Sequence, residues 1–70
     1  MDRRLMFVLL VQTAALNHAI PAGRGLAVDC VYRAMHCKIP DETEPYDLRT
    51  YAQELVDYFY GMDERPEWLV

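Results

Sequence analysis

The stretch that decides the fold is LMFVLLVQTAALNHAI, residues 5–20, in which every side chain from Leu5 to Val11 is apolar. A helix that is apolar on all sides is buried on all sides in a folded protein. The sequence therefore predicts a central helix over residues 2–19 that the rest of the chain covers. A breaker cluster at residues 21–25 ends this helix, because its proline cannot continue the helical backbone.

Two amphipathic helices follow the central one. Residues 25–37 carry an apolar stripe at helical spacing, and residues 45–60 carry the clearest i, i+3, i+4, i+7 pattern of the chain. The stripe of the second helix consists of Leu26, Ala27, Cys30, Val31, Ala34 and Met35. The stripe of the third consists of Leu48, Tyr51, Ala52, Leu55, Val56, Phe59 and Met62. Strict alternation is absent, so we predict an all-α fold of three short helices, a helical hairpin plus a third helix.

The helix ends carry capping signals. His18 falls in the last turn of the first helix, where a partial positive charge is favoured. Gly61 follows the third helix at the position that needs a positive φ. The candidate N-caps of the third helix are Thr43, Glu44 and Asp47, with Pro45 in its first turn.

The 70 residues form a single helical domain, residues 1–62, followed by an acidic and apolar tail, residues 63–70. A chain of this size buries only about 60% of the surface that its unfolded form exposes, so a second subunit is a common source of stability. Trp68 and Leu69 are too apolar to remain in water. We expect them either to fold back onto the core or to grip a partner or a second subunit.

The first helix predicts a compact homodimer, intertwined or side by side. Each covering helix offers one apolar stripe a little over 100° wide, so two of them leave a strip of the first helix uncovered. Soluble monomers seldom expose several hundred Å² of contiguous apolar surface, and a two-fold partner would remove it. The predicted dimer interface consists of Leu5, Val8, Leu9, Leu16 and Trp68.

The charge is divided unevenly along the chain. Residues 1–38 hold five basic and two acidic side chains, a charge of +3, whereas residues 39–70 hold two basic and nine acidic ones, a charge of −7. Phosphates repel an acidic surface, so a general nucleic-acid binder and a direct nucleic-acid contact are disfavoured. The acidic half suits a partner with a basic surface.

The polar side of the third helix is the predicted partner-binding face. Tyrosine is enriched in protein interfaces because it combines a large rigid ring with a polar tip. The predicted partner-binding residues are Asp47, Glu54, Asp57, Tyr58 and Tyr60. The alternative is an ordinary solvated face with packed tyrosines.

Cys30 and Cys37 are seven residues apart, or roughly 10 Å along a helix axis, which is too far for a disulfide within that helix. We predict that both are reduced and buried in a cytoplasmic protein. With His18 and His36 they lack the ligand spacing of a zinc site, and no catalytic motif is present, so we predict no metal, no cofactor and no enzymatic activity.

A secretory signal and a membrane span are also disfavoured, because Gln12 and Thr13 interrupt the apolar run.

Two segments carry a resemblance to a known group of proteins: MDRRLMFVLLVQTAALNHA, residues 1–19, and YDLRTYAQELVDYFYGM, residues 46–62. With its length, charge and helical layout, the chain resembles the small early proteins that phages make to disable host machinery, in particular the anti-activators of quorum sensing. The resemblance implies a small helical dimer in the host cytoplasm that binds the DNA-binding domain of a LuxR-type transcription activator. It is also similar in function to inhibitors of the pilus-assembly ATPase.

Three functions follow from these observations. The first is a non-enzymatic inhibitor that occupies a basic surface on a host protein. The second is a passive protein-interaction or assembly module. The third is a small DNA-binding regulator, which the acidic third helix disfavours because its carboxylates would meet DNA phosphates.

Overall fold

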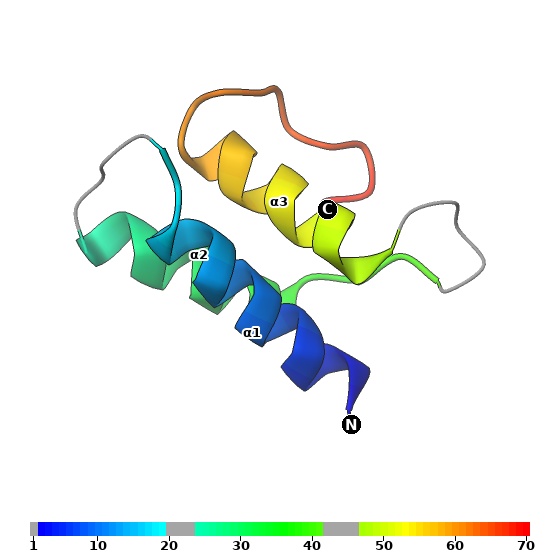
Figure 1. Ribbon diagram of the computed structural model, residues 1–70. Helices are drawn as coiled ribbons and strands as arrows, with labels where there is room; N and C mark the ends of the chain where they lie inside the picture. Colours follow the sequence, from blue (N-terminus) through cyan, green and yellow to red (C-terminus); the bar gives the residue numbers. More distant parts are fainter. Residues whose placement is uncertain (1, 20–23, 42–46) are drawn as a thin grey trace.

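Three helices form the fold of the computed structural model, which describes residues 2–19, 24–41 and 47–70. In chain order they are α1 (Arg3–Leu16), α2 (Arg24–His36) and α3 (Leu48–Phe59) (Figure 1). No strand occurs in the described residues, and the predicted all-α class is confirmed. The predicted caps Thr43 and Glu44, Pro45, and most of the breaker cluster lie outside the described residues.

Helix α1 is the centre of the fold, because it packs extensively against both other helices while α2 and α3 meet only locally. α2 lies beside α1, and α3 lies on a neighbouring side of it (Figure 1). The core contributions of α1 are Phe7, Val11 and Ala15. The other helices, the residue directly after α2 and the tail supply Cys30, Ala34, Cys37, Tyr51, Ala52, Leu55, Val56 and Leu69.

Capping side chains begin the two helices whose N-termini are described in detail. The carboxylate of Asp2 accepts from the backbone N–H groups of Arg4 and Leu5, which have no partner inside the first turn of α1. Asp47 accepts from the Thr50 N–H at 3.0 Å and begins α3. Of the three predicted caps of α3, Asp47 is therefore the one that the described residues confirm.

Gly61 ends α3 as predicted. Its φ of 78° lies in the left-handed region, which costs glycine little because it has no Cβ. Its N–H donates to the Tyr58 carbonyl at 3.0 Å, and the Met62 N–H donates to the Asp57 carbonyl at 2.9 Å. This pair of bonds is the Schellman arrangement, which satisfies two carbonyls at the helix end.

Two arginines at the start of α1 attach it to the end of α2 and to the segment that follows α2. Arg4 donates from Nη1 to the Ala34 carbonyl at 2.8 Å, and Arg3 donates to the Pro40 carbonyl. The carbonyls at a helix C-terminus carry partial negative charge, so a guanidinium there is favourable. These contacts set α1 and α2 side by side with opposite directions.

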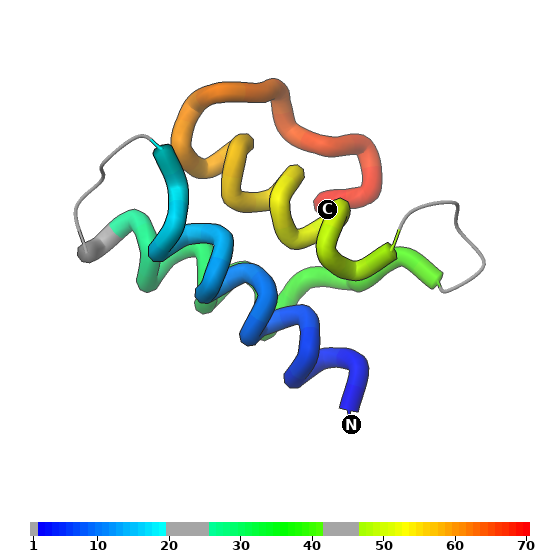
Figure 2. Tube along the Cα trace, in the orientation of Figure 1, coloured from blue at the N-terminus to red at the C-terminus, as the bar shows by residue number. Residues whose placement is uncertain are grey.

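The C-terminal tail folds back onto the domain. Figure 2 shows it leaving α3, arching over that helix and returning toward its N-terminal half. Leu69 is fully buried, and Trp68 packs edge-on against Phe7 and Tyr51 with ring centroids 6.2 and 5.4 Å away. The fold-back alternative for the tail is the one the structure shows.

One side of α1 remains open within the single chain. Leu5, Leu9 and Leu16 keep 49%, 45% and 71% of their surface exposed. These residues recur at i, i+4 and i+11, so they share one face of the helix. Burial on all sides, which the apolar run predicts, is therefore not reached by the covering elements of one chain.

Both cysteines are free and buried, as predicted. Burial, with a smaller contribution from the neighbouring Asp29 carboxylate, raises the pKa of the Cys30 thiol to about 11.

In the described part of the chain, no helix combines the length and apolarity that a membrane crossing requires.

Candidate functional site

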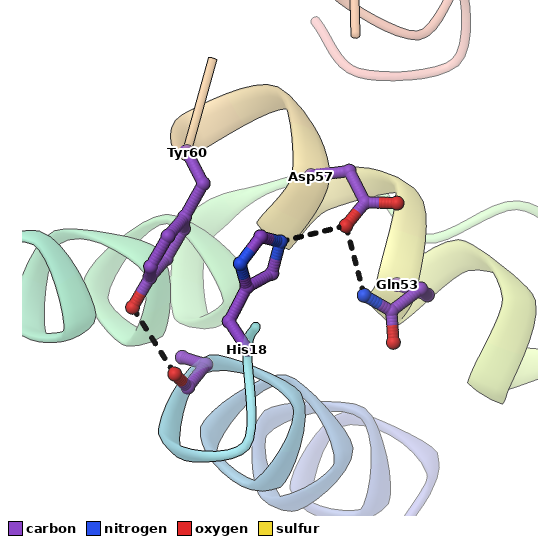
Figure 3. A network of polar contacts seen from close by, with 5 residues as sticks. His18, Gln53, Asp57 and Tyr60 are labelled. Carbon is purple, nitrogen blue, oxygen red and sulfur yellow. Dashed lines mark hydrogen bonds and ion pairs between the residues drawn. The ribbon is translucent and has the colours of Figure 1, made fainter. Parts of the chain in front are cut away.

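A polar cluster joins the end of α1 to the last turns of α3. Nε2 of His18 donates to Oδ1 of Asp57 at 3.0 Å, and the Gln53 amide donates to the same oxygen at 2.9 Å. Figure 3 shows the imidazole of His18 between Asp57 and the ring of Tyr60. The two rings stack with centroids 4.2 Å apart, and the Tyr60 hydroxyl donates to the Ala15 carbonyl at 3.1 Å.

This cluster depends on where α1 ends. The sequence predicts a helix through residue 19, but α1 stops at Leu16 with Asn17 as its C-cap. His18 therefore lies beyond the helix instead of in its last turn. From that position its side chain, only 4% exposed, reaches Asp57 and is covered by Tyr60. The prediction that His18 falls in the last turn of the first helix is wrong, because α1 ends at Leu16 and a contact with α3 fixes the His18 side chain.

An open cleft of about 510 Å³ adjoins the cluster, between α1 and α3. Its polar side chains include His18, Asp57, Gln53 and Arg49. The hydroxyl of Thr13, which also lines the cleft, donates to the Leu9 carbonyl at 2.9 Å and is engaged within its own helix. The contacts of these side chains therefore fit a structural role, the attachment of α1 to α3.

The predicted partner-binding residues of α3 are largely engaged within the fold. Asp47 caps α3, and its hydrogen bonds from the Thr50 N–H and hydroxyl lower its pKa. Glu54 accepts from Nε1 of Trp68 at 2.8 Å. Asp57 and Tyr60 belong to the polar cluster, and Tyr58 is partly buried with its ring edge-on to Phe59. The sequence places these residues on one helix correctly but does not reveal their intramolecular partners.

Three carboxylates of the tail are more open than those of α3. Asp63, Glu64 and Glu67 are exposed, and the first two line a shallow hollow of about 240 Å³ with Glu54 and Pro66. We refer to Glu54, Asp63, Glu64 and Glu67 as the acidic surface. The sequence does indicate this surface, because three of the five residues from 63 to 67 are acidic. The predicted binding residues were assigned to the third helix instead, and the tail was considered for the apolar character of Trp68.

A second hollow, apolar and about 520 Å³ in volume, lies between α1 and α2. It is lined by Gln12, Ala15, Leu16, Ala27, Val28, Val31, Tyr32 and Met35. Met35 was predicted in the core stripe of α2, but about half of its surface is exposed, because Cys30, Ala34 and Cys37 face the core instead. Met62, assigned to the stripe of α3, is also mostly exposed, because α3 has already ended there.

The predicted dimer residues separate into two groups. Leu5, Leu9 and Leu16 are exposed on the open side of α1. Val8 is partly buried against the core, and the Trp68 ring is packed against other side chains of the same chain. Sequence reasoning did not include the exposed side chains of α2, Val28, Tyr32 and Met35, which extend the open face.

No three His, Cys, Asp or Glu side chains converge on a metal-binding arrangement among the residues the structure describes. His18 contacts Asp57, whereas the ring of His36 lies 4.6 Å from that of Tyr32 on α2.

Comparison with protein-family models, curated proteins and solved structures gives no match for this chain.

Proposed function

We propose that this chain is a non-enzymatic protein-binding inhibitor that acts in the host cytoplasm and places its acidic surface against a basic surface of a host protein. The observation that carries the proposal is the exposure of Asp63, Glu64 and Glu67, the first two of which line one hollow with Glu54. Concentrated negative charge attracts a positively charged partner over a distance and excludes partners of like charge.

The tail is held in place before any partner arrives. Leu69 is buried, and Trp68 is fixed by its packing on Phe7 and by its hydrogen bond to Glu54. The carboxylates beside these anchors therefore lose less conformational freedom on binding than those of a free tail. Such preorganisation supports a docking role for this surface.

The DNA-binding domain of a LuxR-type activator is the partner that we propose. A DNA-binding face carries lysine and arginine that neutralise phosphates, so it is a basic surface of the required kind. An acidic protein on that face would compete with DNA and thereby inhibit the activator. The resemblance to phage anti-activators of quorum sensing supports this choice, and the pilus-assembly ATPase is the second candidate.

The test compares two charge reversals that change the net charge equally. Glu64→Lys alters the acidic surface, whereas Asp29→Lys alters an exposed carboxylate on α2. Binding to the purified DNA-binding domain is measured by calorimetry at two salt concentrations. We expect Glu64→Lys to weaken binding on the order of tenfold and Asp29→Lys to have little effect. Equal loss in both variants would mean that only overall charge matters and would contradict the assignment of the surface.

Reversal of Glu54 and Asp57, to which the sequence alone points, is a less direct test. Glu54 holds Trp68 and Asp57 holds His18, so lysine at either position would disturb the fold as well as the surface.

A competition assay with labelled operator DNA separates inhibition from passive attachment. Displacement of the DNA supports the inhibitor, and binding without displacement supports an assembly module. No binding to a domain that still binds DNA contradicts the proposed partner.

A further inference from the structure

The open side of α1 continues onto α2 as one apolar face. Leu5, Leu9 and Leu16 form the α1 part, and the exposed side chains of α2 lie across the apolar hollow from Leu16. We refer to this set as the α1–α2 face. Its six large side chains are Leu5, Leu9, Leu16, Val28, Tyr32 and Met35.

The size of this face approaches what a stable dimer interface needs. Val28 and Tyr32 each keep 65% of their surface exposed, and all six large side chains are 45% exposed or more. Together they offer on the order of 600 Å² of surface, compared with about 800 Å² per partner in a standard stable interface. Soluble monomers rarely leave a larger contiguous apolar patch.

The charge distribution favours a second copy on this face. The residues lining the hollow are uncharged, and Gln12 is the most polar of them. A face without charge can meet its own copy with no repulsion of like charges. Contact through α3 and the tail would instead bring the acidic surfaces of two copies together. Joining the copies through α1 and α2 leaves both acidic surfaces free.

The extent of the face distinguishes a second copy from a single docked helix. A helix lying in the hollow would cover Leu16, Val28 and their neighbours, but Leu5 and Leu9 are not part of its lining. They would stay exposed on α1. A partner that presents two neighbouring helices can cover both the hollow and these leucines, and another copy of this chain presents such a pair.

We propose that the α1–α2 face is a two-fold interface between two copies of this chain, which together form a four-helix arrangement. In a two-fold interface the same surface of each copy contacts the other, so the contact closes at two chains. This inference rests on the apolar face and is independent of the proposed inhibitory function.

The first experiment is sedimentation equilibrium of the wild-type protein at micromolar concentration. A mass of twice 8.2 kDa is expected. A stable mass of 8.2 kDa across the concentration range would overturn the proposal. A mass that keeps rising with concentration would overturn it as well, because an open-ended contact does not use one self-complementary face.

Variants then locate the interface. Leu16→Glu on α1 and Val28→Glu on α2 each place a charge in the apolar contact and should raise the dimer Kd by more than about a hundredfold. Leu9→Asp is a third variant with the same expected effect. These side chains are exposed in the single chain, so circular dichroism should remain helical. Any variant that fails to fold is set aside in favour of the others, and the wild-type measurement needs none of them.

Met62→Glu is the matched control, because Met62 is equally apolar and 54% exposed but lies beyond the end of α3. It should leave the dimer intact. Dissociation by Met62→Glu together with an intact dimer in Leu16→Glu and Val28→Glu would place the interface elsewhere and refute the α1–α2 face.

Discussion

The imidazole of His18 and the carboxylate of Asp57 lie 3.0 Å apart, although the two residues are 39 positions apart in sequence. His18 follows the C-terminal end of α1, and Asp57 lies in the last turns of α3. The contact is mostly shielded from water, since the two side chains are 4% and 23% exposed. Because this contact connects the end of α1 to α3, its loss should lower the free energy of unfolding of the whole domain.

Asp57→Ala should lower the free energy of unfolding by about 1–3 kcal/mol, because it leaves the buried imidazole without its carboxylate acceptor. Urea denaturation followed by circular dichroism measures the change. Gln53→Ala is the control, since Gln53 donates to the same carboxylate oxygen from an exposed position. Its effect should stay within about 0.5 kcal/mol. Equal effects of the two substitutions would mean that the His18 contact adds nothing.

Trp68→Ala should destabilise the protein by about 2–3 kcal/mol, less than for a fully buried tryptophan because the ring is only partly buried. The variant loses ring contacts with Phe7 and Tyr51 and the hydrogen bond to Glu54. Trp68→Phe keeps a ring but removes the Nε1–H donor, so its cost should be about 1 kcal/mol. Thermal unfolding followed by circular dichroism ranks the variants, and identical melting of wild type and Trp68→Ala would show that the tail adds no stability.

The thiol of Cys30 should resist labelling in the folded protein. The thiolate is the nucleophile, and burial raises the pKa of Cys30 to about 11 from an ordinary value of 9.0. An aromatic disulfide reagent at pH 8 should react with neither cysteine until denaturant is added. An intramolecular bond between Cys30 and Cys37 in a non-reducing mass measurement would contradict the helical backbone between them, which α2 and the bond from the Cys37 N–H to the Arg33 carbonyl form.

The same pKa shift predicts a loss of stability in alkali. The thiol of Cys30 ionises near pH 9 in the unfolded chain and near pH 11 in the folded protein. Its contribution to the free energy of unfolding is therefore fully present below pH 9. This contribution declines as the pH rises from 9 to 11. Cys30→Ala should lose less stability over that interval than the wild type. Parallel curves for the two proteins would assign the alkaline transition to other groups.

Asp47 predicts a loss of stability in acid. Hydrogen bonds from the Thr50 N–H and hydroxyl lower the pKa of Asp47 below 3.8, so the ionised cap stabilises the fold above pH 3.8. This stabilisation disappears as the pH falls through the lowered pKa. Asp47→Asn keeps a capping oxygen without the charge and should show a weaker acid dependence than the wild type. Thermal melting between pH 2 and pH 6 measures the difference, and an unchanged acid limb would contradict it.

Local signals in the sequence were sufficient for the helices and several of their ends. A continuous apolar run predicts the first helix, and periodic apolar residues predict the other two, because a helix brings every third or fourth side chain to one face. Asp47 and Gly61 mark the ends of α3 because a carboxylate can accept from free N–H groups and glycine adopts positive φ readily. The spacing of Cys30 and Cys37 excludes a disulfide by helix geometry alone. Each of these predictions depends only on residues a few positions apart.

Tertiary structure alone decided which residues meet across the fold. The pairing of His18 with Asp57 and of Trp68 with Glu54 depends on how helices and tail pack, which no local pattern specifies. The width of two covering stripes predicts an open side of α1, but the sequence does not predict that this apolar face continues onto α2 through Met35. A stripe gives the apolar side of a helix, whereas the angle at which neighbours approach decides how much of that side they cover, and that angle is set by all the packed side chains together.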